Sequence, residues 1–549
     1  MTRANTLCGL LFSVWLGLGA APANAEIPRS ALETIRRIPI QHGGRIKPFD
    51  SFARETVKQI TGTSTIDGED PVKTVLQIMA EPEPWQAKPL IEVPFRPLRA
   101  GLGMDPNARR ISYTDLVATR KLMRMLPTIV QKQQRDEKLT ILENETMDAF
   151  GRFVTFSNLV EQRLELVPPC VKSERVWQPI LQAEGCAQDV QEKLRVSWNT
   201  LMQAVRAGAP EAINTAASHL SQRLFDMSGQ ALEHAPWRPR LEVWYNRIGF
   251  FRIAQIAYLI AAALLLVGLW AGRAPLSAAG LGVLIASALV HVAGIVMRVV
   301  LGGRPPVSNF FETMLWLPLV AVMISLVLER LYRVGYIGLS AALVAAITLV
   351  LADYVPLDPS ITPVVAVLRS NLWLTIHVLT IVASYGALAL ATMLAHVYGV
   401  CYLTGGPRHR ALRSLDLVLY RAIQVGVVLL AGGVMLGAVW ANASWGRYWG
   451  WDPKETWALI TLLWFLAVLH GRFAGWIKGI GVAMATIGGF FLLLMTYYGV
   501  SFYLVGLHSY AGGNAKPLPT LLVVYLIAEA VFLAVLGGAK GLRKRAGAG

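Results

Sequence analysis

Residues 440–457, WANASWGRYWGWDPKETW, contain five tryptophans directly before an apolar segment. Indole rings at such density offer flat, polarisable faces to a large planar ligand, and Arg447 and Lys454 are cations suited to carboxylates at the ligand's edge. A porphyrin with two propionates has this shape and charge. Tryptophans also gather where membrane proteins cross the lipid headgroups, but such a belt explains two or three rings rather than five. We therefore interpret the loop as a platform for haem b. Its candidate contacts are Trp445, Arg447, Trp449, Trp451 and Trp457.

Asp452 belongs to the same loop and has a second interpretation. It precedes Pro453 and stands three residues before Glu455, which is how a helix commonly begins. We predict helix capping as its main role and keep it among the candidate haem contacts.

The composition is that of a polytopic membrane protein with a soluble part. The chain has 549 residues, of which 54% are hydrophobic and 16% charged, and its mean hydropathy is +0.46. A net charge of +16 would suit nucleic acid in a soluble protein. Here much of the excess falls in the expected cytoplasmic loops and tail, where topology and anionic lipid explain it. We expect no nucleic-acid partner, and no Walker or dinucleotide fingerprint supports nucleotide use.

Three segments follow from the distribution of polar and apolar residues. Residues 1–25 combine Arg3, an apolar run and Ala-Asn-Ala, which is typical of a cleavable secretory signal. Residues 26–246 are polar and helix-periodic and predict a mainly helical periplasmic domain of unassigned role. Residues 247–549 form the transmembrane haem-handling domain. The fold class is therefore an all-α polytopic membrane protein, with about nine transmembrane helices preceded by an exported, mainly helical soluble domain.

The apolar stretches also predict a topology. With the N-terminal domain outside, the Arg- and Lys-rich connectors all fall on the cytoplasmic side of a bacterial inner membrane, and the tryptophan-rich loop lies on the periplasmic side between the sixth and seventh spans. The nine expected spans are near residues 248–271, 276–300, 310–329, 335–354, 372–403, 419–440, 456–470, 479–504 and 518–539.

This topology predicts how deep several histidines lie in the membrane. His377, in the first turns of the fifth span, and His508, after the eighth, both lie near the outer face and flank the tryptophan-rich loop. Neutral imidazole is a common axial ligand of haem iron, so the pair is a candidate for holding a porphyrin from opposite sides. A histidine bonded to a backbone carbonyl at a helix end is the competing interpretation for each.

His470 lies about 20 Å into the seventh span by helical rise, near the inner leaflet. Two interpretations stay open: a second, inner haem ligand that marks where haem enters, or an interfacial histidine beside Arg472. For His291 and His396, both inside spans, satisfied helix packing is the favoured account.

These residues carry a resemblance to a known family. The segment 445–457, WGRYWGWDPKETW, resembles the WWD signature of the CcsA/ResC family of system II cytochrome c biogenesis. The similarity extends over about 270–512, since GRPPVSNFFE at 303–312, WLTIHV at 373–378 and GLHSY at 506–510 have family counterparts.

The resemblance implies a function. In that family the WWD loop and two external histidines, matched here by His377 and His508, bind haem that is joined to CXXCH apocytochrome c, and the transmembrane histidine after the loop matches His470. We expect a haem lyase subunit that moves haem to the external platform, with a ResB/CcsB-like membrane partner and apocytochrome c as substrate. Two alternatives are a haem transporter or chaperone without lyase activity, and a scaffold that recruits apocytochrome or a thioredoxin-like reductant.

The chain also departs from the family pattern. Position 304 is Arg where many relatives have His, and the domain at 26–246 and the ninth span have no counterpart in the shortest members. We therefore expect a component of the synthase rather than a complete fused enzyme. The phrase QHGGRIKPFD at 41–50 is turn-rich, and a structural turn is at least as expected as a contact with partner or substrate.

Cysteine usage points to an oxidising compartment for the N-terminal domain. Cys170 and Cys186 form an exported pair, and a structural disulfide worth roughly 3 kcal/mol of loop entropy is the first interpretation. A thiol relay that keeps substrate cysteines reduced is the alternative.

Overall fold

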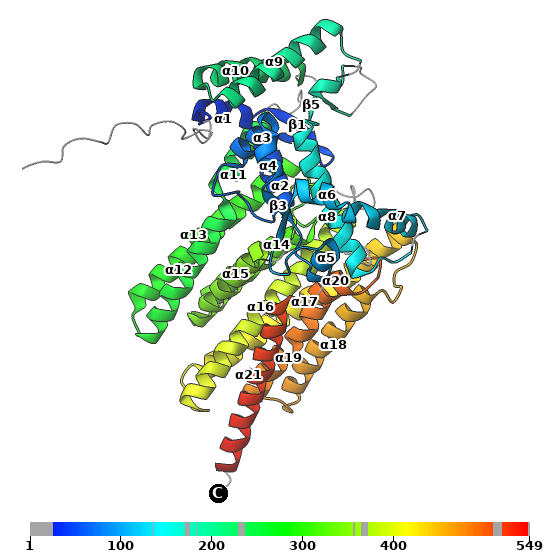
Figure 1. Cartoon of the computed structure of the whole chain (residues 1–549). Helices are drawn as coiled ribbons and strands as arrows, with labels where there is room; N and C mark the ends of the chain where they lie inside the picture. Colours follow the sequence, from blue (N-terminus) through cyan, green and yellow to red (C-terminus); the bar gives the residue numbers. More distant parts are fainter. Residues whose placement is uncertain are drawn as a thin grey trace, which may run out of the picture.

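The computed structural model describes residues 26–135, 137–170, 176–183, 185–228, 237–354, 357–363, 372–508 and 519–546. The predicted signal segment, residues 1–25, lies outside this part of the chain. The described residues are mainly helical and contain three small two-stranded sheets, which confirms the predicted fold class. They build two hydrophobic clusters, one from residues between Ile27 and Leu224 and one from residues between Ala254 and Leu536. Figure 1 shows the short elements of the first region at one end of the long helices of the second.

The first cluster is built by short helices and antiparallel strand pairs. β1 pairs with β2, β3 with β4, and β5 with β6. The elements in chain order are α1 (Arg29–Arg36), β1 (Pro39–His42), β2 (Arg45–Pro48), α2 (Phe49–Thr61), α3 (Pro71–Ala80), α4 (Pro82–Gln86), β3 (Pro89–Glu92), α5 (Arg96–Leu102), β4 (Arg110–Ser112), α6 (Tyr113–Thr119), α7 (Lys121–Gln134), α8 (Ile141–Val160), β5 (Glu165–Val167), β6 (Gln178–Pro179), η1 (Ile180–Gln182), α9 (Gln188–Ala207) and α10 (Pro210–Ser228).

The turn-rich phrase at 41–50 covers the end of β1, the turn and all of β2 in the β1–β2 hairpin. Its two-residue turn is Gly43-Gly44, with φ of 59° and 79°. Both values are in the left-handed region that a tight hairpin turn requires and that glycine adopts at little cost. The structural interpretation of this phrase is thus confirmed.

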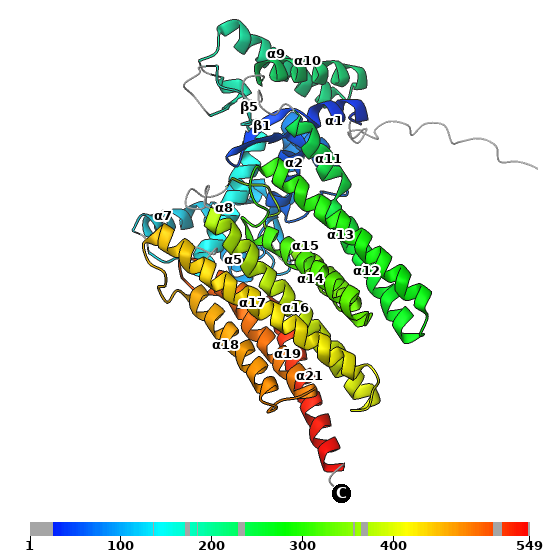
Figure 2. The ribbon, with the colours of Figure 1, turned by 180° about the vertical axis from the view of Figure 1, so that it is seen from behind.

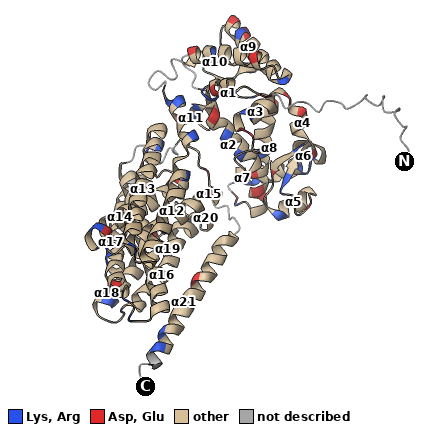
Figure 3. Cartoon of the chain, turned by 90° about the vertical axis from the view of Figure 1, so that its left-hand side faces the viewer, with Lys and Arg blue, Asp and Glu red and all other residues tan. Residues whose placement is uncertain are grey.

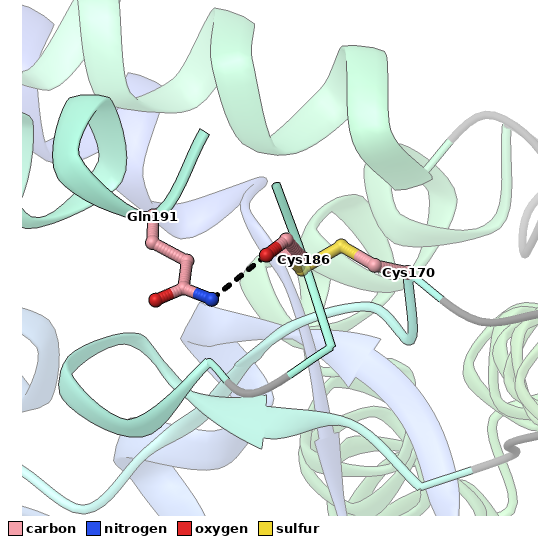
Figure 4. The surroundings of a disulfide bond; sticks show 3 residues. All are labelled: Cys170, Cys186 and Gln191. Atoms are coloured by element: carbon pink, nitrogen blue, oxygen red, sulfur yellow. Dashed lines mark hydrogen bonds between the residues drawn. A yellow bond between two sulfur atoms is a disulfide. The ribbon is translucent and has the colours of Figure 1, made fainter. Parts of the chain in front are cut away.

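Cys170 and Cys186 form a disulfide in the same region, as the first interpretation of this pair predicted. Figure 4 shows the bond beside Gln191, whose Nε2 donates to the carbonyl oxygen of Cys186 at 2.8 Å. The cross-link ties the segment after β5 to the start of α9.

The second cluster is a bundle of long helices. Within the described residues, nine helical segments are long and apolar enough to span a membrane, in agreement with the nine predicted stretches. The elements are α11 (Arg238–Ile248), α12 (Phe250–Trp270), α13 (Ala274–Gly302), α14 (Phe310–Tyr332), α15 (Tyr336–Tyr354), α16 (Leu372–Gly405), α17 (Leu412–Trp445), α18 (Pro453–Phe473), α19 (Ile480–Leu494), η3 (Met495–Gly499), α20 (Val500–Tyr503) and α21 (Thr520–Ala546).

Two spans differ in detail from the predicted stretches. α17 extends beyond its predicted apolar stretch at both ends. It stops at Gly446, which has φ of 72°. The eighth span is interrupted by the π-helical turn η3 between α19 and α20. Charged side chains gather toward the ends of the bundle and are sparse along its middle (Figure 3), as burial in lipid requires.

Small residues let α16 and α17 lie side by side along their length (Figures 1 and 2). A Cβ at Gly433 would stand 2.7 Å from the Ile381 side chain, and a Cβ at Gly426 would stand 2.6 Å from Leu388. Glycine at these positions therefore permits the close helix contact, which is how membrane helices commonly pack.

Two buried polar clusters include side chains of α11 or its neighbours, and the first of them joins the N-terminal region to the bundle. In the first, Arg45 of β2 donates two hydrogen bonds, of 2.6 and 2.7 Å, to Glu242 of α11, and Ser51 donates to the same carboxylate. Glu242 is 4% exposed. Because a buried carboxylate is tolerated only with partners, this cluster fixes the hairpin on α11.

The second cluster lies at the start of α14. The Glu312 carboxylate accepts from Arg298 at 3.0 Å and from Arg304 at 2.6 Å, and Arg298 also donates to the Pro359 carbonyl oxygen at 2.9 Å. Arg298 further contacts the Tyr245 hydroxyl of α11. The arginine at position 304, a departure from the family pattern, is thus half of a buried ion pair.

We predict that Glu242→Ala destabilises the protein by about 3 kcal/mol, because Arg45 is left half-buried without its carboxylate. Thermal unfolding of the purified protein, followed with limited proteolysis of the N-terminal region, measures the effect. Arg247→Ala is the matched control, since its ion pair with Glu33 is solvent-exposed and worth at most about 1 kcal/mol. Equal effects of the two substitutions would contradict the prediction.

Candidate functional site

Four neighbouring helices position the predicted site residues. His377 lies in the second turn of α16, α17 ends at Trp445, α18 begins at Pro453, and His508 follows α20. α17 contacts α16 and α18, and α18 contacts α19 and α20, so these segments meet at one end of the bundle.

Asp452 caps α18 as predicted. Its side chain accepts from the Lys454 backbone N–H at 2.9 Å, and Glu455 accepts in return from the Asp452 N–H at 3.2 Å. The Glu455 carboxylate also accepts from Gly450 N–H at 2.8 Å. This reciprocal capping box holds the end of the tryptophan-rich loop against the first turn of α18.

The Asp452 carboxylate has two further partners that the sequence did not indicate. It accepts from Leu507 N–H at 2.7 Å and from the His508 ring Nδ1 at 2.9 Å. Burial raises the pKa of this carboxyl, but the hydrogen bonds from His508 and the backbone outweigh burial and hold the pKa below its usual value. Gly506 makes the approach possible, because a Cβ there would stand 2.4 Å from Asp452 Oδ1. One charged carboxylate therefore joins the loop to the segment after α20.

His508 is oriented by this contact. With Nδ1–H donated to a carboxylate, the ring keeps its Nε2 lone pair for another partner. A carboxylate behind one ring nitrogen is the usual arrangement of a metal-ligating histidine, because it fixes the ring and raises its basicity.

His377 is held in the same way by a carbonyl. Its Nδ1 donates to the Gly433 carbonyl oxygen of α17 at 2.8 Å, which again leaves Nε2 available. The ring lies against Gly437, where a Cβ would stand 2.6 Å from Cε1. The bond to a carbonyl, which the competing interpretation invoked, is thus compatible with ligation through the other nitrogen.

Both histidines line one cleft at this end of the bundle. Its volume is about 110 Å³, it is partly open to the outside, and its walls include Tyr448, Trp449, Lys454 and Tyr497.

Aromatic rings connect the two histidines. The Trp440 indole stacks on His377 with centroids 6.3 Å apart and 8° between the planes, and it also lies 5.8 Å from His508. Trp445 meets Trp440 at 4.7 Å and His508 at 5.4 Å. The buried Nε1–H of Trp440 has no hydrogen-bond partner among the described residues. Trp440 was not among the predicted site residues; its place at the start of the tryptophan-rich segment was the available signal.

The remaining loop residues lie farther out. Trp449 and Trp451 contact edge to face at 5.8 Å, and Trp451 is 71% exposed. Trp451 has φ of 56°, a left-handed conformation that costs a bulky residue of order 1 kcal/mol or more. Arg447 is exposed and folds over Gly450, where a Cβ would overlap its Nη1.

Trp457 and His470 do not line the cleft. Trp457 lies half-buried in the second turn of α18, and its carbonyl oxygen accepts from Thr461 and Thr496. His470 lies near the C-terminal end of α18, where Nδ1 donates to the Leu466 carbonyl oxygen at 2.7 Å and the ring is exposed on the bundle surface.

The other two membrane histidines have neighbours that fit helix packing. His396 uses both ring nitrogens, one toward the Thr392 carbonyl oxygen at 2.8 Å and one toward Glu529 of α21 at 2.9 Å. His291 is buried beside the Tyr258 hydroxyl at 3.3 Å.

Comparison with known proteins identifies the family. A family profile described as "Cytochrome C assembly protein" matches residues 307–508, which begin before α14 and end at His508. The chain is 35% identical over 247 residues to "Cytochrome c biogenesis protein CcsA" of Prochlorococcus marinus, covering 38% of this chain and 77% of that protein. The chain belongs to the CcsA family.

Two further relatives extend this result. A CcsA protein of another Prochlorococcus marinus strain is 34% identical over 263 residues, covering 42% of this chain and 83% of that protein. "Protein NrfI" of Wolinella succinogenes is 29% identical over 502 residues, covering 87% of this chain and 54% of that protein. The NrfI alignment necessarily includes much of the region before the bundle, and this chain spans about half of NrfI. The CcsA family acts in cytochrome c assembly and handles haem.

If His377 holds the haem that the family handles, Gly437→Ala is expected to lower haem retention about tenfold, because the added Cβ forces the His377 ring out of place at a cost of about 1 to 3 kcal/mol by overpacking. Soret absorption of the purified protein, per mole of chain, measures retention. Gly432→Ala on the same helix is the matched control, since no atom stands within 4 Å of its added Cβ. Equal haem content in the two variants would rule out a role for the His377 position.

We predict a pH-dependent stability contribution from Asp452. Its lowered pKa means that the stabilisation is fully present above about pH 4 and is lost as pH falls through the folded-state pKa. Asp452→Asn is therefore expected to destabilise the protein by about 2 kcal/mol at pH 7, and the gap to wild type should narrow as the pH falls below about 4. Thermal unfolding of both proteins between pH 3 and 8 measures the gap, and a constant gap would contradict the assignment.

Proposed function

We propose that this chain is the haem-handling subunit of a cytochrome c haem lyase. It holds haem b at the cleft between His377 and His508 and positions it for attachment to CXXCH apocytochrome c. The observation that carries the proposal is the matched state of the two histidines: they come from different spans, line one cleft, and each has Nδ1 held by an acceptor so that Nε2 is available.

The residues present fit haem as a substrate. Two imidazole Nε2 atoms are suitable axial ligands, the indole of Trp449 lines the cleft, and Trp440 and Trp445 pack against the histidine rings. The Trp440 N–H without a described partner and the strained, exposed Trp451 are features of a site that binds a ligand rather than of a membrane anchor. We propose Arg447 and Trp451 of the loop, and Trp457 in the second turn of α18, as supporting contacts.

The proposed role of the chain in the reaction is to position the haem. In thioether formation a cysteine S–H adds across a haem vinyl group: sulfur bonds to one vinyl carbon and hydrogen to the other, with no net oxidant or reductant. Axial imidazoles and a rigid aromatic surround hold the substrate still and exclude water while each vinyl meets its thiol. One of the two histidines would later give way to the histidine of the substrate motif.

We propose the following orientation and partners. The region 26–246 and the cleft face the periplasm across a bacterial inner membrane, with residues 1–25 as a signal and the arginine-rich connectors on the cytoplasmic side. A ResB/CcsB-like membrane subunit completes the lyase, and a thioredoxin-like protein keeps apocytochrome cysteines reduced. His470 is an inner haem contact; its exposed ring with Nε2 available supports a partner-facing role.

We predict that His377→Gly and His508→Gly each abolish the six-coordinate haem spectrum of the reduced, purified protein, and that added imidazole restores it because it replaces the missing ligand. His396→Gly is the matched control from α16, since both of its ring nitrogens are already used within the bundle. Identical spectra for wild type and both outer-histidine variants would refute the haem-site proposal and leave the scaffold alternative.

The reaction product distinguishes a haem lyase from a haem transporter. Co-expression with the partner subunit and an apocytochrome should yield haem that stays on the cytochrome after denaturation. If the chain binds haem but no such product forms, its function is haem transport or presentation alone.

A further inference from the structure

Lys454 is a cation placed inside the cleft. It lies in the first turn of α18, where its side chain reaches across to the eighth span and lines the same space as His377 and His508. Its Nζ donates to Ser501 Oγ at 2.8 Å and to the Tyr497 carbonyl oxygen at 3.2 Å. Arg447, the other cation of the loop, is exposed and does not line the cleft.

The partners of the Lys454 ammonium are neutral. In the part of the chain that the structure describes, no carboxylate stands within ion-pair distance of Nζ. The two nearest carboxylates in sequence are already used: Asp452 by His508 and backbone N–H groups, and Glu455 by the N–H groups of Gly450 and Asp452. A hydroxyl and a carbonyl only partly offset the desolvation of an ammonium, so this position favours an anionic ligand.

The backbone opposite Lys454 is shaped for this contact. Tyr497 lies in the π-helical turn η3, a rare conformation that is frequent at functional sites. The Tyr497 hydroxyl bonds Thr313 of α14 at 2.8 Å, and its ring stacks on Phe310 at 4.7 Å. The acceptors of Lys454 are thereby fixed by a third helix, and the ammonium is held in a defined place at the cleft wall.

We propose that Lys454 binds a propionate of the haem and so determines how the porphyrin is rotated in the cleft. This inference rests on the proposed function and adds to it a group that recognises the edge of the substrate. The two propionates of haem lie on one side of the macrocycle and the vinyl groups lie away from them. Anchoring the propionate side at α18 therefore turns the reacting vinyl groups away from α18, toward an incoming apocytochrome. Lys454 is a positioning residue, since the reacting atoms are elsewhere.

Titration of the haem-free protein with haem and with haem dimethyl ester tests the proposal, with dissociation constants taken from Soret absorption. Wild type is expected to prefer haem about tenfold, the equivalent of about 1.4 kcal/mol for one charge-assisted contact. Lys454→Met should lower the affinity for haem to that for the ester and leave the ester affinity within about twofold of wild type. Lys454→Arg should keep the preference, and Lys454→Gln gives a polar second variant in case the methionine variant does not fold.

Lys478→Met is the matched control and should keep the wild-type preference, because this lysine is exposed and does not line the cleft. The Soret circular dichroism, which senses porphyrin rotation, should change in Lys454→Met and not in Lys478→Met. The proposal is overturned if Lys454→Met keeps the tenfold preference, if it loses haem and ester equally, or if the preference disappears in Arg447→Met instead. Wild type that binds both porphyrins equally also overturns it while the histidine site stands, whereas wild type that binds neither porphyrin overturns the proposed function itself.

Discussion

The arrangement of the site depends on the buried carboxylate of Asp452. It caps α18, accepts from the backbone after α20 and holds the His508 ring. A charged group removed from water must have its oxygens filled, so these contacts form together or not at all. The tryptophan-rich loop, the start of the seventh span and the end of the eighth are consequently one unit, although Asp452 and His508 are 56 residues apart.

The wall of the cleft that carries His377 depends on a different feature, the close packing of α16 and α17. Gly433 offers a carbonyl oxygen to His377, and Gly437 offers the space that the ring occupies. The Asp452 carboxylate fixes the His508 ring and the Gly433 carbonyl oxygen fixes the His377 ring. Each imidazole therefore keeps an available Nε2. The Trp440 ring contacts both histidine rings and the Trp445 ring contacts His508, so the histidines share one aromatic environment.

The N-terminal region is attached to this bundle by buried charges rather than by a continuous apolar core. Arg45 with Glu242 joins β2 to α11, and Arg298 and Arg304 with Glu312 join α13 and the segment after it to α14. Such clusters fix orientation because each carboxylate has one set of partners that satisfies it. The pair of Arg45 with Glu242 holds the β1–β2 hairpin on α11, at the start of the first span.

Much of this protein follows from its sequence alone. The nine spans were predictable because lipid demands about twenty apolar residues per crossing, and the cap at Asp452 because a helix start requires an acceptor for its free N–H groups. The tryptophan density and the outer positions of His377 and His508 pointed to one planar ligand. The partners of these side chains were not predictable. His508 bonds Asp452, His377 bonds Gly433, and Trp440 contacts both histidine rings, and each of these contacts joins residues from different helices or loops. The environments of Lys454 and Arg447 likewise depend on neighbouring helices. Local sequence pattern determines where helices begin and end, whereas helix packing alone decides which polar groups meet, and each buried group must find its partner there.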